Sequence, residues 1–284
     1  MRYAFSVVLA LFLTAGTVAG GIMKVHEQVL HSQVRVRTQT AGGSGTVIYS
    51  QKGEDGYFST IIVTCQHVIS DAVKIEDKWD SLLKKQRKVE VIQPVIVEFF
   101  DWEGVPPGKS PLTSGATADI VAYSEKHDMA LIHLRLKEKP PTALLLPRDR
   151  IEDVVIGSPT WAVGCALGHD PILTQGIVTH QGDIVGEVDF WMSSAQIIFG
   201  NSGGGMFFES DEYYFIGIPS LVAITGWGNQ AITYMGYFSP VSRMYTFLDE
   251  QIFDFLIPGS KKTEQQCTDE RKAKRKHEEE KRYK

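Results

Sequence analysis

Short runs of apolar residues, separated by Gly and Pro, fill most of the chain. Val34 and Val36 alternate with Arg35 and Arg37, a period of two that is typical of a half-buried strand. Residues 61–64 are continuously apolar and β-branched, which indicates a strand buried on both faces. Similar patterns recur at residues 46–49, 89–100, 119–123, 129–134, 154–156, 161–163, 176–179, 190–192, 205–208, 213–219, 223–225 and 231–238. Many short strands with turn signals between them predict an all-β sandwich or barrel.

Three segments depart from the strand pattern. Within residues 70–88, Trp79, Leu82 and Leu83 have helical spacing among many charged residues, so we expect a surface helix there. Residues 245–256 also have helical periodicity and are expected to close the domain as a C-terminal helix. Residues 25–30 fit either a short helix or the start of a strand.

The first residues have the layout of a targeting segment. Arg2 is followed by an almost wholly apolar stretch, residues 4–15, and then by small residues up to residue 21. This order predicts a secretory signal over residues 1–20, with cleavage near Ala19. Because apolar and small residues continue to Met23, an uncleaved membrane anchor is the alternative. Either reading predicts a secreted or periplasmic protein, with a membrane tether at the N-terminus in the second case.

The opposite end of the chain has a different composition. Residues 261–284 hold ten Lys or Arg and six Asp or Glu, a local charge of 10 − 6 = +4. Such a segment cannot bury enough apolar surface to fold alone, so residues 259–284 are expected to form a charged, disordered tail. Contact with an anionic surface is the lesser alternative. The whole chain has a net charge of −5, which gives no support to nucleic-acid binding.

The three cysteines, Cys65, Cys165 and Cys267, form no disulfide framework and no pair with metal-ligand spacing. Cys65 and Cys165 lie in apolar runs and are expected to be buried thiols, although a bridge between them stays open at this point. The sequence has no phosphate loop and no dinucleotide fingerprint. We therefore expect neither a metal nor a cofactor, and the sequence carries no signal for an oligomeric state.

The strongest chemical signal is Ser202, which lies among glycines in residues 199–205. A nucleophilic serine needs an exposed Oγ on a tight turn, and backbone N–H groups that point at the developing oxyanion. The N–H groups of Gly200 and Ser202 would form this oxyanion hole. A plain glycine-rich turn between two strands is the structural alternative. The string also fits the nucleophile elbow of α/β-hydrolases.

The order of the other catalytic side chains separates these alternatives. An α/β-hydrolase needs its acid and its histidine after the serine, yet only His277 follows Ser202, within the charged tail. Upstream, His67 ends the apolar run 61–64 and Asp128 begins another apolar run. Alone, each would be read as a structural residue, but the order His, Asp, Ser is that of chymotrypsin. Asp119, which begins a similar apolar run, is the backup acid.

Taken together, the motifs resemble those of trypsin-like peptidases, and most closely the protease domain of the HtrA/Deg family. The matching segments are residues 64–69 (the histidine motif), 128–131 (D-[IL]-A-[LV]), 162–168 (A-I-G-N-P-F-G), 174–178 (T-x-G-I-V), 200–204 (G-N-S-G-G) and 237–241 (F-A-I-P-V). The resemblance covers residues 34–256. It implies two six-stranded antiparallel β-barrels with a C-terminal helix, in a domain over residues 25–258 whose barrels divide near residues 140–155.

The chain also departs from the family pattern. Cys165 and Ala166 replace the usual Asn and Pro, Gly205 replaces a common Pro, and a long insertion separates His67 from Asp128. Only 28 residues follow Leu256, which is too few for a PDZ domain. We therefore expect an HtrA-like protease domain that lacks a PDZ domain.

The resemblance implies a serine endopeptidase that cleaves protein or peptide substrates through an acyl-enzyme intermediate. His67 would act as the base, Asp128 would orient it, and Ser202 would be the nucleophile. A protease-fold binding or scaffold protein without catalytic activity is the alternative.

Asn201 replaces the acid that pairs with a freed N-terminus in trypsin-type zymogens, so activity without such processing is expected. The residues expected to form the substrate pocket are Gln196, Phe199, Gly236, Tyr237 and Phe238. They include no acid, which favours a small or medium apolar P1 side chain over Lys or Arg.

Overall fold

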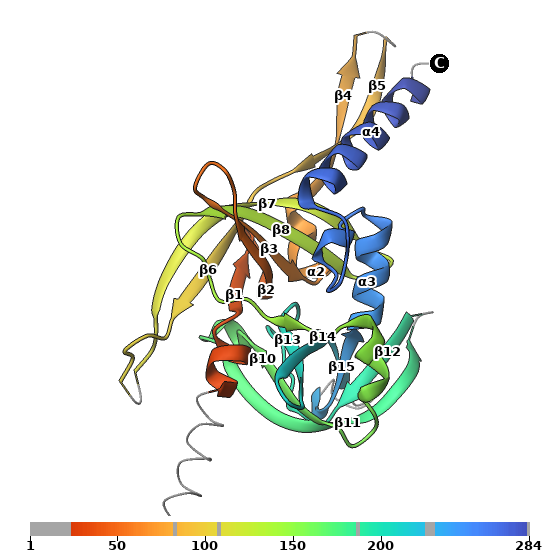
Figure 1. The fold of residues 1–284 in the computed structure, drawn as a ribbon. Helices are drawn as coiled ribbons and strands as arrows, with labels where there is room; N and C mark the ends of the chain where they lie inside the picture. Colours follow the sequence, from red (N-terminus) through yellow and green to blue (C-terminus); the bar gives the residue numbers. More distant parts are fainter. Residues whose placement is uncertain (1–23, 82–83, 107–108, 186–187, 225–230, 283–284) are drawn as a thin grey trace, which may run out of the picture.

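Two β-barrels make up the body of the computed structural model, with α3 and α4 along one side (Figure 1). The structure describes residues 24–81, 84–106, 109–185, 188–224 and 231–282. The leader predicted for residues 1–20 lies outside these ranges. No helix in the described part of the chain is both long and apolar enough to span a bilayer.

The first barrel is a closed ring of six antiparallel strands in the order β1-β2-β3-β8-β7-β6. Its strands are β1 (Gln33–Arg37), β2 (Gly42–Lys52), β3 (Phe58–Thr64), β6 (Val95–Asp101), β7 (Leu112–Ser124) and β8 (Met129–Leu136). Val34 and Val36 are buried while Arg37 is exposed, as the period of two predicts. The run 61–64 is buried throughout, and β3 pairs with β2 along one edge and with β8 along the other.

The second barrel forms from seven strands in the order β13-β10-β11-β12-β15-β14-β9, and a further β13–β14 pairing closes six of them into a ring. Its strands are β9 (Leu144–Leu145), β10 (Pro159–Gly164), β11 (Ile172–Val185), β12 (Val188–Ser193), β13 (Gly205–Glu209), β14 (Tyr213–Ile224) and β15 (Ala231–Pro240). Helix α3 (Val241–Glu250) follows directly. The predicted all-β fold of two barrels with a C-terminal helix is confirmed.

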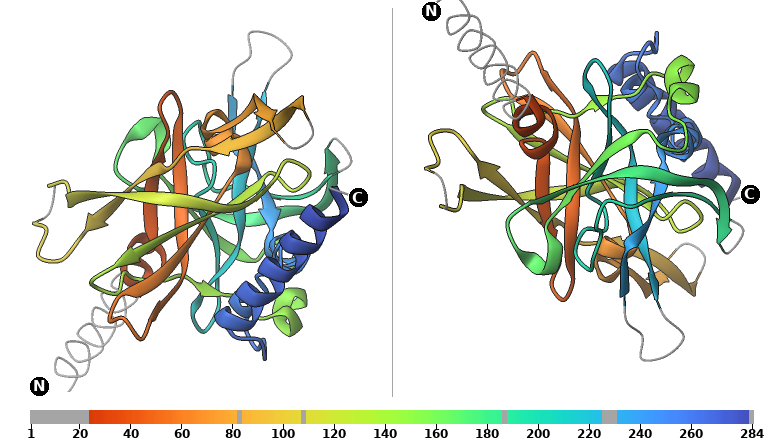
Figure 2. Two further views of the ribbon diagram at one scale, coloured as in Figure 1. Left: turned by 90° about the horizontal axis from the view of Figure 1, so that it is seen from above. Right: turned by 90° about the horizontal axis from the view of Figure 1, so that it is seen from below.

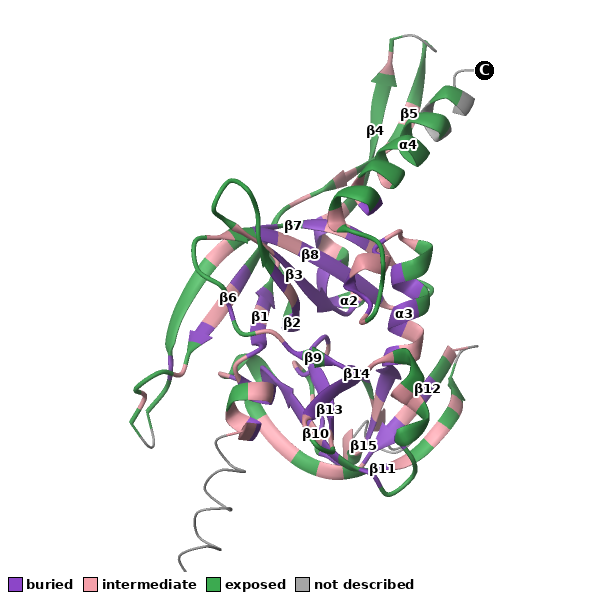
Figure 3. Cartoon of the chain, in the orientation of Figure 1, coloured by how far each residue is buried: buried purple, intermediate pink, exposed green. Residues whose placement is uncertain are grey.

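Short helical turns connect the strands. They are η1 (His26–Leu30), α2 (Gln66–Ile69), η2 (Ser70–Ala72), η3 (Arg148–Asp153), η4 (Ala166–Gly168) and η5 (Asp254–Leu256). Buried residues lie inside both barrels, whereas exposed residues cover the outer projections (Figure 3). Cys65 and Cys165 are buried free thiols, as predicted, and Cys267 is also buried and free.

The surface helix predicted within residues 70–88 is wrong. The chain forms a projecting hairpin of β4 (Val73–Asp80) and β5 (Lys85–Ile92), visible in all views (Figures 1 and 2). Eight residue pairs join the two strands, so cross-strand hydrogen bonding satisfies the backbone and overrides the helical spacing seen from Trp79 onward. Leu82 and Leu83, on which that spacing depended, lie outside the described residues.

The structure also differs from the disordered tail expected for residues 259–284. Helix α4 spans Glu264–Arg282, and its first turns are attached to the first barrel. Cys267 is fully buried, and Glu264 accepts hydrogen bonds from Ser59 and Tyr49. Because composition reports only what a segment can bury by itself, it could not reveal this docking.

Candidate active site

His67 and Asp128 are in direct contact. Strand β3 ends at Thr64, and His67 lies in the short helix α2, at the side of the first barrel that faces the second (Figure 1). Asp128 precedes β8 in a left-handed conformation with φ = 50°, which aspartate tolerates better than most residues. The His67 Nδ1 atom lies 2.9 Å from Asp128 Oδ2 and 3.0 Å from Oδ1. The His67 main-chain N–H also donates to Oδ1 at 3.0 Å.

These hydrogen bonds set the ionisation of Asp128. Burial by itself would raise the pKa of this carboxyl group, but the hydrogen bonds and charge of His67, together with a hydrogen bond from Ser220, outweigh it and lower the pKa. Asp128 is therefore a stable carboxylate that can orient an imidazole and stabilise its protonated form. Asp119, the backup acid, lies on β7 opposite His133 instead.

Ser202 lies on the glycine turn between β12 and β13, and its side chain is partly exposed. Gly203 has φ = 87°, and a Cβ there would lie 2.2 Å from both the Ser44 carbonyl oxygen and Thr64 Oγ1. Glycine therefore allows the turn to pack against the first barrel. The buried Asn201 stabilises the turn by accepting a hydrogen bond from the Ile198 N–H at 3.1 Å.

The amide of Gly200 is held in a defined orientation. Its preceding carbonyl, on Phe199, accepts a hydrogen bond from the Leu167 N–H at 2.8 Å, and Gly200 has φ = 96°. Within the described part of the chain, neither the Gly200 N–H nor the Ser202 N–H donates to a protein acceptor. Both amides can therefore donate to an oxygen atom of a bound substrate.

Sequence analysis did not identify two serines that connect these loops. The Ser220 Oγ–H donates to Asp128 Oδ2 at 2.6 Å, and the Ser220 carbonyl oxygen lies 3.4 Å from Ser202 Oγ. Buried Ser44 donates its Oγ–H to the Gly200 carbonyl at 2.6 Å and accepts the Cys165 N–H at 2.6 Å. Ser44 lies in a Gly-Ser-Gly string that could have suggested a close approach, whereas Ser220 has no local signal.

Ser202 and His67 belong to the same site, but they are joined less tightly than His67 and Asp128. Gly43 lies against both the His67 segment and the Ser202 turn. A Cβ on Gly43 would lie 2.7 Å from Cγ2 of Val68, the residue after His67, and 3.0 Å from the Ser202 carbonyl oxygen. Among the described residues, no hydrogen bond links Ser202 Oγ to the His67 ring. Such bonds are often long or poorly aligned before substrate binds.

A group of potential metal ligands coincides with this site. One donor atom each from Cys65, His67 and Asp128 lies within 4.8 Å of the others. Burial raises the pKa of the Cys65 thiol well above its ordinary value, which disfavours the thiolate that binds metals. The carboxylate oxygens of Asp128 already accept hydrogen bonds from His67 and Ser220. The donor set therefore fits a hydrogen-bonded site better than a metal site.

The residues predicted to line the substrate pocket do not all lie together. Gln196 and Phe199 are exposed beside the Ser202 turn, and Gly236 faces the segment that contains them, since a Cβ on it would lie 2.4 Å from Ile197 Cδ1. Phe238 is fully buried and packs edge-to-face on Trp191. The ring of Tyr237 instead contacts Phe190 edge-to-face, on the opposite face of β15 from its neighbours.

A hollow of about 510 Å³ adjoins Gly200. It is lined by Arg35, Arg37, Ala41, Gly42, Gly43, Cys165, Gly168 and Gly200. It contains none of the residues predicted for the substrate pocket, so it provides separate space next to Gly200.

Comparisons with known proteins agree with this geometry. Residues 43–218, more than half of the chain, match the model of the trypsin-like peptidase domain. Among solved structures, the HtrA-type protease AlgW with a tripeptide has a TM-score of 0.58 and 18% identity, covering 82% of this chain and 63% of that chain. Deg5 has a TM-score of 0.53 and 18% identity, covering 79% of this chain and 90% of that chain.

The present chain thus spans less than two thirds of the length of AlgW, and at 18% identity these likenesses show the fold. No curated protein sequence matches the chain. The family match and the two-barrel architecture lead to the same conclusion: the chain belongs to the trypsin-like peptidase family of serine proteases.

Proposed function

We propose that the chain is a serine endopeptidase in which His67, Asp128 and Ser202 form the catalytic triad. The observation that carries this proposal is the contact of His67 Nδ1 with a pKa-lowered Asp128 carboxylate, 2.9 Å away, next to a partly exposed serine on a glycine turn. This contact leaves Nε2 as the ring nitrogen available to the serine. The family match of residues 43–218 supports the same assignment.

Hydrolysis would proceed in two halves. Ser202 Oγ attacks the carbonyl carbon of the scissile peptide bond while its proton passes to His67 Nε2. The C–N bond then breaks as His67 returns that proton to the leaving amine, which leaves an acyl group on Ser202. Water attacks this ester by the same proton route and restores the free serine. Throughout, Asp128 accepts a hydrogen bond from the Nδ1–H group of His67 and stabilises the imidazolium form of that ring.

The oxyanion of each tetrahedral intermediate would accept hydrogen bonds from the N–H groups of Gly200 and Ser202. The hydrogen bond from the Leu167 N–H to the Phe199 carbonyl supports this role, because it keeps that carbonyl turned away and its partner amide available. One such donor contributes about 10²- to 10³-fold to turnover.

A small or medium apolar P1 side chain is the proposed specificity. Ile197 is almost fully buried against Gly236, so an apolar side chain fills the space between two segments of the proposed pocket border. A cationic P1 group would also lack a buried counter-charge, because the residues proposed to border the pocket, Gln196, Phe199, Gly236, Tyr237 and Phe238, include no acid. The leader of residues 1–20 would direct the enzyme to a secreted or periplasmic location, or tether it to a membrane.

Digestion of an unfolded protein tests this function and separates it from an inactive scaffold. We would incubate reduced casein with the intact chain and with Ser202→Ala, and identify the new termini by mass spectrometry. Cleavage after small or medium apolar residues is expected for the intact chain, with a loss of about 10⁶-fold in Ser202→Ala. Binding of casein without cleavage by the intact chain would support the scaffold alternative.

A further inference from the structure

A groove of about 680 Å³ lies on the outer side of the first barrel, away from the Ser202 turn. Its floor is the outer surface of β3, β7 and β8, and its walls are the base of the β4–β5 hairpin and helix α4. Both walls project from the barrel (Figures 1 and 2). Helix α4 lies beyond residues 43–218, which match the peptidase domain model, and beyond α3, the helix that closes the two-barrel fold.

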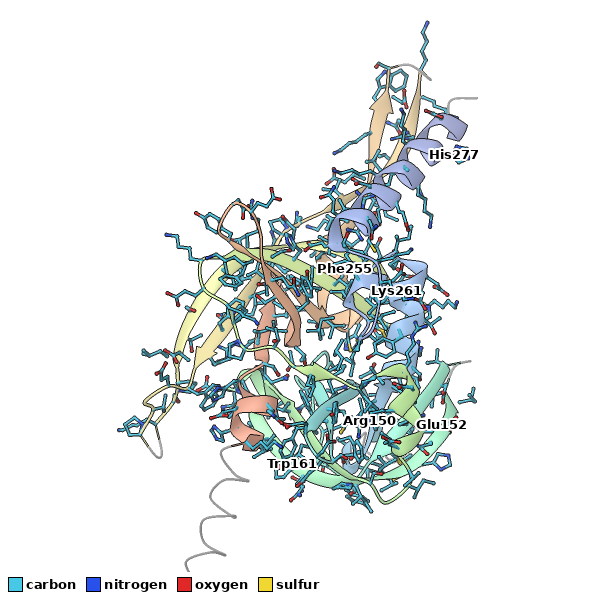
Figure 4. All side chains as sticks on the ribbon, in the orientation of Figure 1. Arg150, Glu152, Trp161, Phe255, Lys261 and His277 are labelled. Carbon is cyan, nitrogen blue, oxygen red and sulfur yellow. The ribbon has the colours of Figure 1, made fainter. Side chains whose placement is uncertain are left out.

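The helix wall carries positive charge. Thr268, Arg271, Lys272 and Arg275 line the groove together with Glu264, and these spacings place them on one helix face. Lys272 and Arg275 are exposed, and neither forms an ion pair within the described residues. His277, which Figure 4 labels near the far end of α4, is two positions beyond Arg275 and therefore lies on the other side of the helix.

The carboxylates of the groove are already bound by hydroxyl groups of the barrel. Glu264 accepts hydrogen bonds from Ser59 Oγ at 2.8 Å and from the Tyr49 hydroxyl at 3.3 Å. Glu90, on β5, accepts a hydrogen bond from the Tyr123 hydroxyl. The three cations of the helix wall exceed these two carboxylates by one charge, 3 − 2 = +1. The lining therefore has a small excess of positive charge, which favours an anionic ligand.

The remaining surface is apolar. Val121 of the floor and Phe255 of η5 line the groove, and Ile92 in the wall is 41% exposed. Ile75 and Trp79 lie on the same face of the hairpin as Glu90, by the register of the two strands, and are 70% and 67% exposed. Exposed apolar side chains that continue from a groove commonly mark a binding surface.

We propose that this groove binds a short, extended protein segment that carries both carboxylate and apolar side chains. The apolar side chains would contact the floor and the hairpin face, and the carboxylates would pair with Lys272 and Arg275. The lining residues of α4 extend over twelve positions, from Glu264 to Arg275, and the eleven steps between them correspond to about 16 Å of helix. An extended segment of about five residues spans that length.

Fluorescence anisotropy with a labelled peptide of about six residues, alternating Asp and Leu, tests this binding. All titrations use Ser202→Ala chains so that the peptide survives. Saturable binding is expected, and the Lys272→Glu, Arg275→Glu double variant should weaken it about tenfold, through two lost ion pairs and new repulsion. The matched control is Lys274→Glu, Lys276→Glu, which makes the same charge change at exposed positions of α4 that do not line the groove.

Three results would overturn the proposal: no saturable binding, an equal loss of affinity in both double variants, or equal affinity for a peptide of alternating Lys and Leu. Vesicles of phosphatidylcholine with phosphatidylglycerol are the second probe. Vesicle binding that depends on Lys272 and Arg275, without peptide binding, would assign these cations to a membrane surface instead. Circular dichroism of each variant excludes loss of folding, and amide hydrogen exchange should show protection of β5 and α4 by the peptide.

Discussion

Replacement of Gly200 by alanine provides a sharp test of the oxyanion geometry. Gly200 has φ = 96°, and a Cβ there would lie 2.6 Å from both the Cys165 carbonyl oxygen and the Leu167 nitrogen. Both contacts are main-chain atoms, which cannot rotate away as the end of a side chain could. The substitution must therefore shift the peptide between Phe199 and Gly200, whose orientation the Leu167 N–H maintains.

The expected magnitude has two parts. The positive φ costs about 1–2 kcal/mol of folding stability for an alanine. Loss of one oxyanion donor lowers kcat by about 10²- to 10³-fold. KM should change much less, because the oxyanion exists only in the transition state and the intermediates that follow it.

Gly157 supplies a matched control. It has the same φ of 96°, but a Cβ there would meet no atom within 4 Å. Gly157→Ala therefore carries the backbone cost without the displacement at the site. Urea unfolding should show a loss of stability of about 1–2 kcal/mol in Gly157→Ala and a larger loss in Gly200→Ala, and peptide hydrolysis should show a loss of kcat confined to Gly200→Ala. A folded Gly200→Ala protein with the kcat of the parent chain would refute the role of this amide.

Three further changes test the surrounding network. Asp128→Asn should lower kcat by about 10⁴-fold in peptide hydrolysis with little change in melting temperature, because the amide favours the wrong tautomer of His67. Ser44→Ala should lower the free energy of unfolding in urea by about 1–3 kcal/mol, because the buried Cys165 N–H loses its acceptor. Burial lowers the pKa of His133 below its ordinary value of 6.5, so the unfolded chain binds this proton more readily. Stability should be complete above that value and fall as the pH decreases through it, and His133→Gln should make the fall between about pH 7 and pH 5 shallower.

Each of these expectations has a contrary result. An Asp128→Asn enzyme as active as the parent would remove the carboxylate from the mechanism. An unchanged free energy of unfolding in Ser44→Ala would mean that another group accepts the hydrogen bond from the Cys165 N–H. An identical dependence of stability on pH in His133→Gln and the parent would show that other groups cause the loss at low pH.

Local patterns predicted the parts of the fold that depend on neighbours in sequence. The alternation at Val34 and Val36, and the continuous run 61–64, identified strands of the first barrel because burial there follows strand periodicity. The hairpin of β4 and β5 was missed because Trp79 and its charged neighbours have helical spacing, while cross-strand pairing decides the conformation. Helix α4 was missed because its stability comes from docking on the barrel through groups such as Glu264.

In the candidate site, too, local motifs could be recognised in the sequence, whereas contacts between distant residues could not. The proposal of His67, Asp128 and Ser202 could be made from the sequence because the three motifs occur in the order His, Asp, Ser. Ser220 was not, because its hydrogen bond to Asp128 joins residues 92 positions apart. The residues proposed for the substrate pocket include both Tyr237 and Phe238, whose side chains strand alternation places on opposite faces of β15.

The central claim is that Ser202 is a nucleophile activated by His67, and active-site labelling measures this directly. A fluorophosphonate probe, followed by mass spectrometry of the digested protein, should place a single covalent adduct on Ser202. Labelling should be abolished in Ser202→Ala and slowed by orders of magnitude in His67→Ala, since the imidazole accepts the hydroxyl proton. An intact protein that takes up no probe, or one labelled equally fast without His67, would contradict the account.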